Sequence, residues 1–205
     1  MQKLMVAALS SGAGKTSVSM GLAALFRQSG KSVQVYKTGP DYIDPQFYGP
    51  ITGRRCINLD PYFLSESELS ETFSRYQSEA DILLVEAAMG LTDGIAGQGD
   101  KASALQVART LSLPILLLVA RGAEAEAAEK IAALTAEDRA RILGIVLNEG
   151  GKGEAAPGTE VPREIGTVPV LGCIPALGAQ NLKSRHLGLV VPLAPEEILG
   201  FAQRM

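Results

Sequence analysis

Short apolar runs alternate along this chain with longer stretches of helical periodicity. Strand-like runs cover residues 3–9, 32–36, 81–85, 114–119, 142–147 and 168–174. Amphipathic or alanine-rich stretches between and after them cover residues 16–28, 66–78, 102–111, 123–134 and 196–203. This alternation is typical of an α/β domain with a mostly parallel sheet. The pattern therefore predicts a doubly wound sheet with helices on both faces.

Three stretches have neither periodicity. Residues 37–60 are rich in Pro, Gly and Asp, and long loops of this kind inside a compact domain are usually functional or mobile. Residues 89–99 form a second glycine-rich loop, and residues 149–166 carry enough Gly and Pro to predict a flexible loop with little helix. No internal repeat or linker divides the chain, so we expect one domain over residues 1–205.

Composition narrows the functional classes. The chain has 205 residues, 46% hydrophobic residues and a net charge of −3, which excludes a disordered chain and gives no general affinity for nucleic acid or anionic membranes. The longest apolar run, residues 113–120, is too short to cross a bilayer. The two cysteines, Cys56 and Cys173, have no pair spacing, which suits a reducing compartment. We expect a cytoplasmic protein, with Cys173 in the core.

A glycine-rich turn lies where the first strand becomes the first helix. It reads Ser10-Ser11-Gly12-Ala13-Gly14-Lys15-Thr16-Ser17. Its glycines let backbone N–H groups approach phosphate oxygens, and the helix N-terminus adds partial positive charge. Lys15 is predicted to hold the β- and γ-phosphates and Thr16 to bind Mg²⁺. The strict phosphate-loop pattern fails only at its first position, which is Leu9.

Charged side chains follow the next two strands. Lys37, Asp41 and Asp44 leave the second strand, and Glu86 ends the third. Ligands of open α/β sheets bind at the carboxyl edge of the strands, where phosphoryl transfer needs carboxylates for Mg²⁺ and cations for the transferred group. Asp93-Gly94 is equally well read as an ordinary turn.

Together these motifs resemble the synthetase domain of cobyrinic acid a,c-diamide synthase, a P-loop domain of the dethiobiotin synthetase and MinD-like type. The resemblance covers essentially the whole chain. It is carried by Ser11 to Thr16, the run Lys37-Thr38-Gly39-Pro40-Asp41-Tyr42-Ile43-Asp44-Pro45, Asn58-Leu59-Asp60, Glu86 to Gly94, Asn148 and Arg185-His186-Leu187-Gly188-Leu189.

The resemblance implies an ATP- and Mg²⁺-dependent ligase that converts a tetrapyrrole carboxylate to an amide through an acyl phosphate. It implies nucleotide binding by residues 11–17 and Asn148, with the Asn148 amide reading adenine. It also implies that Asp41 and Glu86 complete the metal shell with Thr16. Lys37 would stabilise the transferring phosphoryl group, and Asp93 would position the acceptor carboxylate or ammonia. The tetrapyrrole would face Tyr42, Ile43 and Asp44.

The sequence also departs from this family. The family normally continues into a glutaminase with a nucleophilic cysteine, whereas Cys56 and Cys173 lie within synthetase sequence. We therefore expect direct use of ammonia, supply by a separate glutaminase subunit, or loss of amidation. A second copy of the chain is another candidate partner, since relatives of this fold often dimerise. Ala87, Thr92 and Glu149 replace typical family residues, which leaves the substrate open. His186 is interpreted as structural.

Two other functions fit the same phosphate loop. One is a nucleotide-dependent switch of the MinD and ParA superfamily, although Ser10 stands where those partner-dimer ATPases carry a signature lysine. The other is a ligase like dethiobiotin synthetase that acts on a small carbamate. The Gly-Pro-Asp-Tyr-Ile-Asp-Pro run favours the tetrapyrrole ligase, because a switch does not need a substrate loop.

Overall fold

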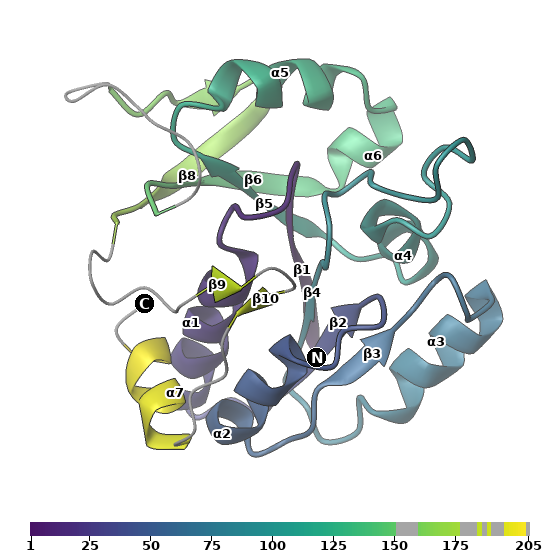
Figure 1. Ribbon diagram of the computed structural model, residues 1–205, viewed down its shortest axis with the longest axis vertical. Coiled ribbons are helices and arrows are strands. Elements are labelled where there is room, and N and C mark those ends of the chain that lie inside the picture. Colours follow the sequence, from purple (N-terminus) through teal and green to yellow (C-terminus); the bar gives the residue numbers. More distant parts are fainter. Residues whose placement is uncertain (151–159, 177–183, 186–187, 190–194, 204–205) are drawn as a thin grey trace.

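A computed structural model describes residues 1–150, 160–176, 184–185, 188–189 and 195–203 of the chain (Figure 1). It contains an eight-stranded sheet in the order β3-β2-β4-β1-β5-β6-β8-β7. The strands are β1 (Gln2–Ala8), β2 (Val33–Thr38), β3 (Ile57–Leu59), β4 (Ile82–Glu86), β5 (Ile115–Ala120), β6 (Ile142–Asn148), β7 (Glu164–Ile165) and β8 (Val168–Ile174). Every pairing is parallel except that of β7 with β8. The predicted doubly wound α/β fold is therefore confirmed.

Helices cover both faces of this sheet. They are α1 (Lys15–Gln28), α2 (Tyr48–Thr52), α3 (Glu66–Arg75), α4 (Ala104–Thr110), α5 (Glu124–Ala132), α6 (Ala136–Ala140) and α7 (Pro195–Ala202). A short 3₁₀ turn, η1 (Asp44–Phe47), precedes α2, and β9 (Ser184–Arg185) pairs with β10 (Gly188–Leu189) in a separate antiparallel ribbon. Within this described part, no helix is long and apolar enough to cross a membrane.

Successive side chains of β1 point to opposite faces of the sheet, and the two faces carry separate hydrophobic clusters. Met5 and Ala7 belong to the hydrophobic cluster that α3, α4 and α5 cover. Val6 and Ala8 belong to the cluster that α1, α2 and α7 cover. Figure 1 shows α1, α2 and α7 close to one another and apart from α5 and α6. Because successive strand residues point to opposite faces and both faces are covered, the central strand is apolar almost throughout.

The topology places a switch point at β1. The chain passes from β1 to β2 and β3, returns to β4 between β1 and β2, and then crosses to β5 on the other side of β1. In open α/β sheets, ligands bind outside the carboxyl ends of the strands at such a point. The turn that follows β1 therefore lies at the position where the topology predicts ligand binding.

Three details of the sequence prediction need correction. Residues 37–60 are not one loop, because η1, α2 and the edge strand β3 lie within them. Helix α2 contains Gly49 and Pro50, which favour a loop in the sequence pattern, and it has only five residues. Strand β3 has only three residues, too few to show alternation. The second detail is α6, which we did not predict. The third is Cys173, which is only partly buried because it lies on β8, toward the edge of the sheet.

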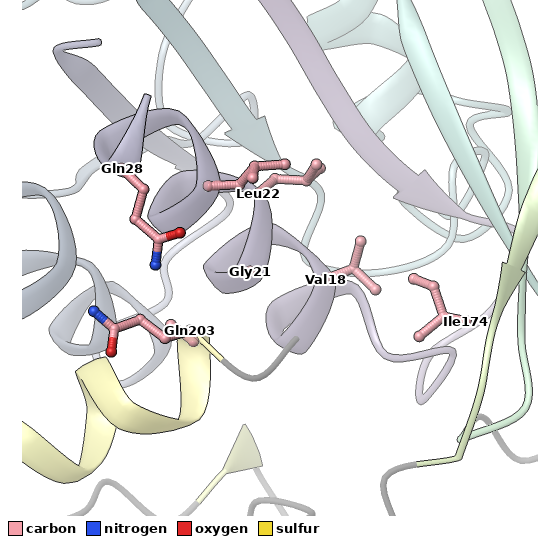
Figure 2. A pocket seen from close by; sticks show the side chains of 8 residues that line it. Val18, Gly21, Leu22, Gln28, Ile174 and Gln203 are labelled. Atoms are coloured by element: carbon pink, nitrogen blue, oxygen red, sulfur yellow. The ribbon is translucent and has the colours of Figure 1, made fainter. Parts of the chain in front are cut away.

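A hollow of about 200 Å³ lies between α1, the end of β8 and the end of α7 (Figure 2). Val18, Leu22 and Gln28 line it from α1, and Ile174 and Gln203 line it from β8 and the end of α7. Its lining includes none of the predicted site residues. The predicted phosphate loop and the charged residues Lys37 and Glu86 lie instead at the carboxyl ends of β1, β2 and β4.

An ion pair between the exposed Arg109 and the buried Asp138 joins α4 to α6. Arg109 donates from Nε and Nη2 to the two carboxylate oxygens of Asp138, at 2.8 and 2.7 Å. Asp138 also accepts from Thr135 Oγ1 at 2.7 Å, and the Thr135 side chain caps α6. The hydrogen bonds from Arg109 outweigh the effect of burial and lower the pKa of Asp138 to about 2. One carboxylate thus links α4 to the start of α6.

We expect D138N to lower the free energy of unfolding by about 1–3 kcal/mol at pH 7, because a charged hydrogen-bond pair is lost. The depressed pKa of Asp138 means that its stabilisation is complete at neutral pH and is lost as the pH falls from about 4 towards about 2. The deficit of D138N should therefore shrink in that range. Urea unfolding at pH 7, 5 and 3 measures it, with exposed E137Q as the control. A deficit that does not depend on pH would contradict this assignment.

Candidate nucleotide and metal site

The phosphate loop runs from the end of β1 to the start of α1. Gly12 and Gly14 have φ values of 82° and 89°, which glycine adopts without the strain that a side chain would bring. The amide of Val18 donates to the carbonyl of Gly14 at 3.0 Å and so begins the helix directly after the loop. Ser11 and Gly12 are exposed, Ala13 is buried, and Ser17 is partly buried in the first turn of α1. The loop thus places its backbone and the N-terminus of α1 at the carboxyl edge of the sheet, as anion binding requires.

Lys15 is buried at the mouth of this loop. Its Nζ donates to the carbonyl of Ser10 at 3.2 Å. Burial lowers the pKa of Lys15 to about 8, although the charge of Glu86 acts in the opposite direction. The side chain therefore folds back over the loop that it is predicted to serve.

The predicted acidic and basic residues meet around Lys37. Strand register pairs Lys37 on β2 with Glu86 on β4. The Lys37 ammonium lies 2.7 Å from Glu86 Oε1, 2.9 Å from Asp44 Oδ2 and 3.5 Å from Asp41 Oδ2. The side chain of Lys37 is 2% exposed and that of Glu86 is 0% exposed. Burial disfavours the ammonium, but Glu86 and Asp44 outweigh it and hold the pKa of Lys37 above its usual value.

Thr16 connects this charged cluster to the phosphate loop. Its hydroxyl lies 2.5 Å from Glu86 Oε1 and 3.1 Å from Asp44 Oδ2. Burial tends to raise the pKa of Asp44, but Lys37 and the hydroxyl of Thr16 hold it below its usual value. Residues from the loop, β2, η1 and β4 therefore converge on one point at the carboxyl edge of the sheet.

Asp41 and Asp44 lie in the same turn but have different surroundings. Asp41 Oδ1 accepts from the amides of Ile43 and Asp44, at 2.9 and 3.1 Å, so this carboxylate organises the turn. Asn58 on β3 donates from Nδ2 to the carbonyl of Asp41 at 2.7 Å and ties the turn to the edge strand. Asp44 is instead directed to Thr16 and Lys37. Tyr42 is 80% exposed, so its ring stands beside the cluster in open solvent.

Tyr48 is a site residue that the sequence analysis missed. Its phenol donates to Glu86 Oε2, the carboxylate oxygen that Lys37 does not contact. Burial, together with the neighbouring charge of Glu86, raises the pKa of Tyr48 well above its usual value. No motif marked this residue, because α2 itself was not predicted. The hydroxyl fixes the orientation of a carboxylate that is wholly enclosed.

The cluster offers the ligand types that Mg²⁺ prefers. One hydroxyl and two carboxylates meet at Thr16, Asp44 and Glu86, and such oxygen donors suit a hard divalent cation. Asp44 Oδ1 is buried and has no hydrogen-bond partner, so it retains a free acceptor there. Across the part of the chain that the structure describes, no group of three or more His, Cys, Asp or Glu side chains has the geometry of a metal site. A Mg²⁺ ion would therefore need the Thr16 hydroxyl as one ligand. Lys37 would also have to move away from Asp44 and Glu86, because its ammonium now contacts both carboxylates.

Two further predicted residues, Asp93 and Asn148, form hydrogen bonds outside the Lys37 cluster. Asp93 is exposed, and its Oδ2 accepts from the amide of Gly90 at 2.8 Å. Asn148 ends β6, and its Nδ2 donates to the carbonyl of Ala13 at 2.8 Å. Ile43 is partly buried beside Tyr42. His186 lies outside the described residues, as does most of the predicted loop that follows Glu149.

The fold and the phosphate loop together define a P-loop nucleotide-binding domain. The chain matches the family described as CbiA, the CobQ/CobB/MinD/ParA nucleotide binding domain, over residues 4–187. It therefore belongs to the CbiA family, and the resemblance drawn from its motifs is confirmed. Chloroplast FtsY from Physcomitrella patens has a similar fold, with a TM-score of 0.51 and 14% identity over 98% of this chain and 65% of that one.

Curated relatives carry names of diamide synthases. The chain is 38% identical to cobyrinate a,c-diamide synthase from Synechococcus sp., over 91% of this chain and 41% of that protein. It is 39% identical to hydrogenobyrinate a,c-diamide synthase from Streptomyces coelicolor, over 92% of this chain and 39% of that protein. It is 35% identical to cobyrinate a,c-diamide synthase from Dehalococcoides mccartyi, over 99% of this chain and 44% of that protein. The chain thus spans about two fifths of the length of these relatives.

We expect K37M to lower the free energy of unfolding by about 3–5 kcal/mol, because it leaves Glu86 and Asp44 buried without their cation. Chemical denaturation followed by circular dichroism measures this loss. The double variant K37M/E86Q should recover part of it, since one buried negative charge is removed with its partner.

K130M is the matched control. It breaks the partly exposed pair of Lys130 and Glu126 on α5, so its cost should stay below about 1 kcal/mol. Equal losses in K37M and K130M would show that the Lys37 cluster does not support the fold.

Proposed function

We propose that this chain is the nucleotide-binding synthetase part of an amide ligase of the cobyrinate a,c-diamide synthase type. It would use ATP and Mg²⁺ to activate a tetrapyrrole carboxylate. The observation that carries this proposal is that the Thr16 hydroxyl of the phosphate loop and the buried ammonium of Lys37 both contact the carboxylates of Asp44 and Glu86. The names of the relatives support the proposed substrate class, and the geometry of the site supports phosphoryl transfer.

The phosphate loop would hold the triphosphate. Backbone N–H groups of residues 11–17 would cradle the phosphates at the N-terminus of α1. Lys15 would leave the carbonyl of Ser10 and contact the β- and γ-phosphates. Lys15 would then exchange its hydrogen bond to the neutral Ser10 carbonyl for hydrogen bonds to charged phosphate oxygens, which are stronger.

Mg²⁺ would be held by Thr16, Asp44 and Glu86. When bound, it would neutralise the charge that spreads over the phosphate oxygens during transfer. The free acceptor of Asp44 supports this assignment over Asp41, whose Oδ1 already serves the turn. Lys37 would then move from the carboxylates towards the transferring phosphoryl group. Before that movement, the carboxylates of Glu86 and Asp44 favour the ammonium form of Lys37.

The substrate would lie over the turn at residues 41–44. Tyr42 is exposed next to the cluster, and Ile43 adds apolar surface, as a broad macrocycle requires. A substrate carboxylate oxygen would attack the γ-phosphorus of ATP, and the bond to the β-phosphate oxygen would break to release ADP. Ammonia would then attack the acyl carbon, lose a proton, and displace phosphate to leave the amide. Asp93 would orient the carboxylate or accept that proton.

The test is ATP turnover with Mg²⁺, ammonium and either cobyrinic acid or sirohydrochlorin, followed by product mass. ADP release that depends on the acid, with a mass loss of about one unit per carboxylate, supports the ligase. A parallel reaction with glutamine in place of ammonium identifies the nitrogen source. Nucleotide binding without amide formation in any reaction would favour the switch function, and ADP release at the same rate without an acid would contradict carboxylate activation.

We expect D44N to reduce acid-dependent turnover by about 100-fold or more, since it removes an acceptor at the proposed metal position. D41N is the matched control, because Asn keeps the Oδ1 acceptor that organises the turn, and its loss should be about tenfold or less. Turnover as a function of Mg²⁺ concentration measures both, and D44N should also need more Mg²⁺. A larger loss in D41N than in D44N would return the metal position to Asp41.

A further inference from the structure

Asn148 lies where β6 ends, and its side chain reaches across to the phosphate loop. The loop and Asn148 are 135 residues apart in sequence, yet Nδ2 lies 2.8 Å from the carbonyl oxygen of Ala13. Asn148 is 6% exposed and Ala13 is 3% exposed, so this hydrogen bond is enclosed. A buried bond of this kind is costly to leave unmade. Its geometry therefore constrains the loop.

The backbone around Asn148 gives the side chain a fixed base. Its carbonyl accepts from the amide of Arg121 at 3.1 Å, which links it to the end of β5. The next amide, that of Glu149, donates to the carbonyl of Ile174 at 2.9 Å at the end of β8. The side-chain oxygen accepts from the amide of Gly150 at 3.1 Å. Hydrogen bonds to the ends of β5 and β8 thus fix the backbone at Asn148, from which the side chain reaches the phosphate loop.

The fit between Asn148 and Gly14 is close. A Cβ placed on Gly14 would lie 2.3 Å from Asn148 Nδ2, so the Asn148 amide would have to move. The positive φ of Gly14 also favours glycine at this position. The side chain of Asn148 therefore occupies the space next to Gly14 that a Cβ would fill.

We propose that Asn148 is a positioning residue that aims the Gly14 amide at the phosphates. The peptide between Ala13 and Gly14 is planar and trans, so its C=O and N–H point in opposite directions. By holding the carbonyl of Ala13, Asn148 turns the N–H of Gly14 away from itself and towards the side where phosphate binds. The structure thus gives Asn148 a role in triphosphate binding that is separate from any contact with the base. This role depends on nucleotide binding and not on the identity of the carboxylate substrate.

The test uses a ligand that has no base. We compare the wild type, N148A and N148S for affinity towards Mg²⁺-tripolyphosphate, Mg²⁺-ATP and Mg²⁺-GTP by calorimetry or by displacement of a fluorescent ATP analogue. Both variants should bind all three ligands about 2- to 10-fold more weakly, which corresponds to the loss of one hydrogen bond. N148S keeps a polar side chain that is too short to reach Ala13, so it remains informative if N148A folds poorly.

A base-reading role gives a different result. In that case tripolyphosphate affinity stays at the wild-type value while the ratio of ATP to GTP affinity changes, and this outcome would overturn the proposal. T135A is the control for general loss of stability, since it removes the cap of α6 far from the loop and should leave all three affinities unchanged. Amide hydrogen exchange gives a second measurement without any ligand. Gly14 should exchange faster in N148A than in the wild type, and equal rates would also contradict the proposal.

Discussion

The buried ammonium of Lys37 is the interaction on which the candidate site depends. Three carboxylates share it, and one of them, Glu86, is completely enclosed. Removing two ions from water costs more than a simple pair returns, so such an arrangement is stable only when every polar atom is well placed. Here Thr16 and Tyr48 supply the additional hydrogen bonds to Glu86. The free acceptor on Asp44 is the exception, and it marks the point where the cluster is incomplete.

Sheet topology explains why these side chains meet. Lys37 and Glu86 are 49 residues apart but occupy paired positions on neighbouring parallel strands, so their side chains leave the same face of the sheet. Parallel strands bring their carboxyl ends to one edge, and the phosphate loop leaves the adjacent strand β1 at that edge. The same constraint let the sequence predict the gathering of Lys15, Thr16, Lys37 and Glu86, because each follows or ends an apolar run.

Other parts could not be predicted from the pattern. The edge strand β3 has three residues and α2 has five, and neither is long enough to display a period. Tyr48 therefore had no structural context in the sequence, although its hydroxyl completes the Glu86 environment. Asp41 and Asp44 are both acids in one turn, and only three-dimensional contacts distinguish the one that accepts turn amides from the one that faces Thr16. The roles assigned to individual site residues remain predictions, whereas the fold class and the family are confirmed.

The two sides of β1 contribute different things to the same loop. Strands β2 and β4 bring charge, through Lys37 and Glu86, to the hydroxyl of Thr16 at the start of α1. Strand β6 brings the neutral amide of Asn148 to the carbonyl of Ala13, three residues earlier. Charged groups at both places would require two desolvated clusters within one loop, each costly to bury. A neutral hydrogen bond fixes the backbone at a smaller cost and leaves the electrostatic field of the crevice to Lys15 and the Lys37 cluster. In this arrangement, a strand on one side of β1 fixes the backbone of the phosphate loop. The strands on the other side of β1 place charged groups next to it.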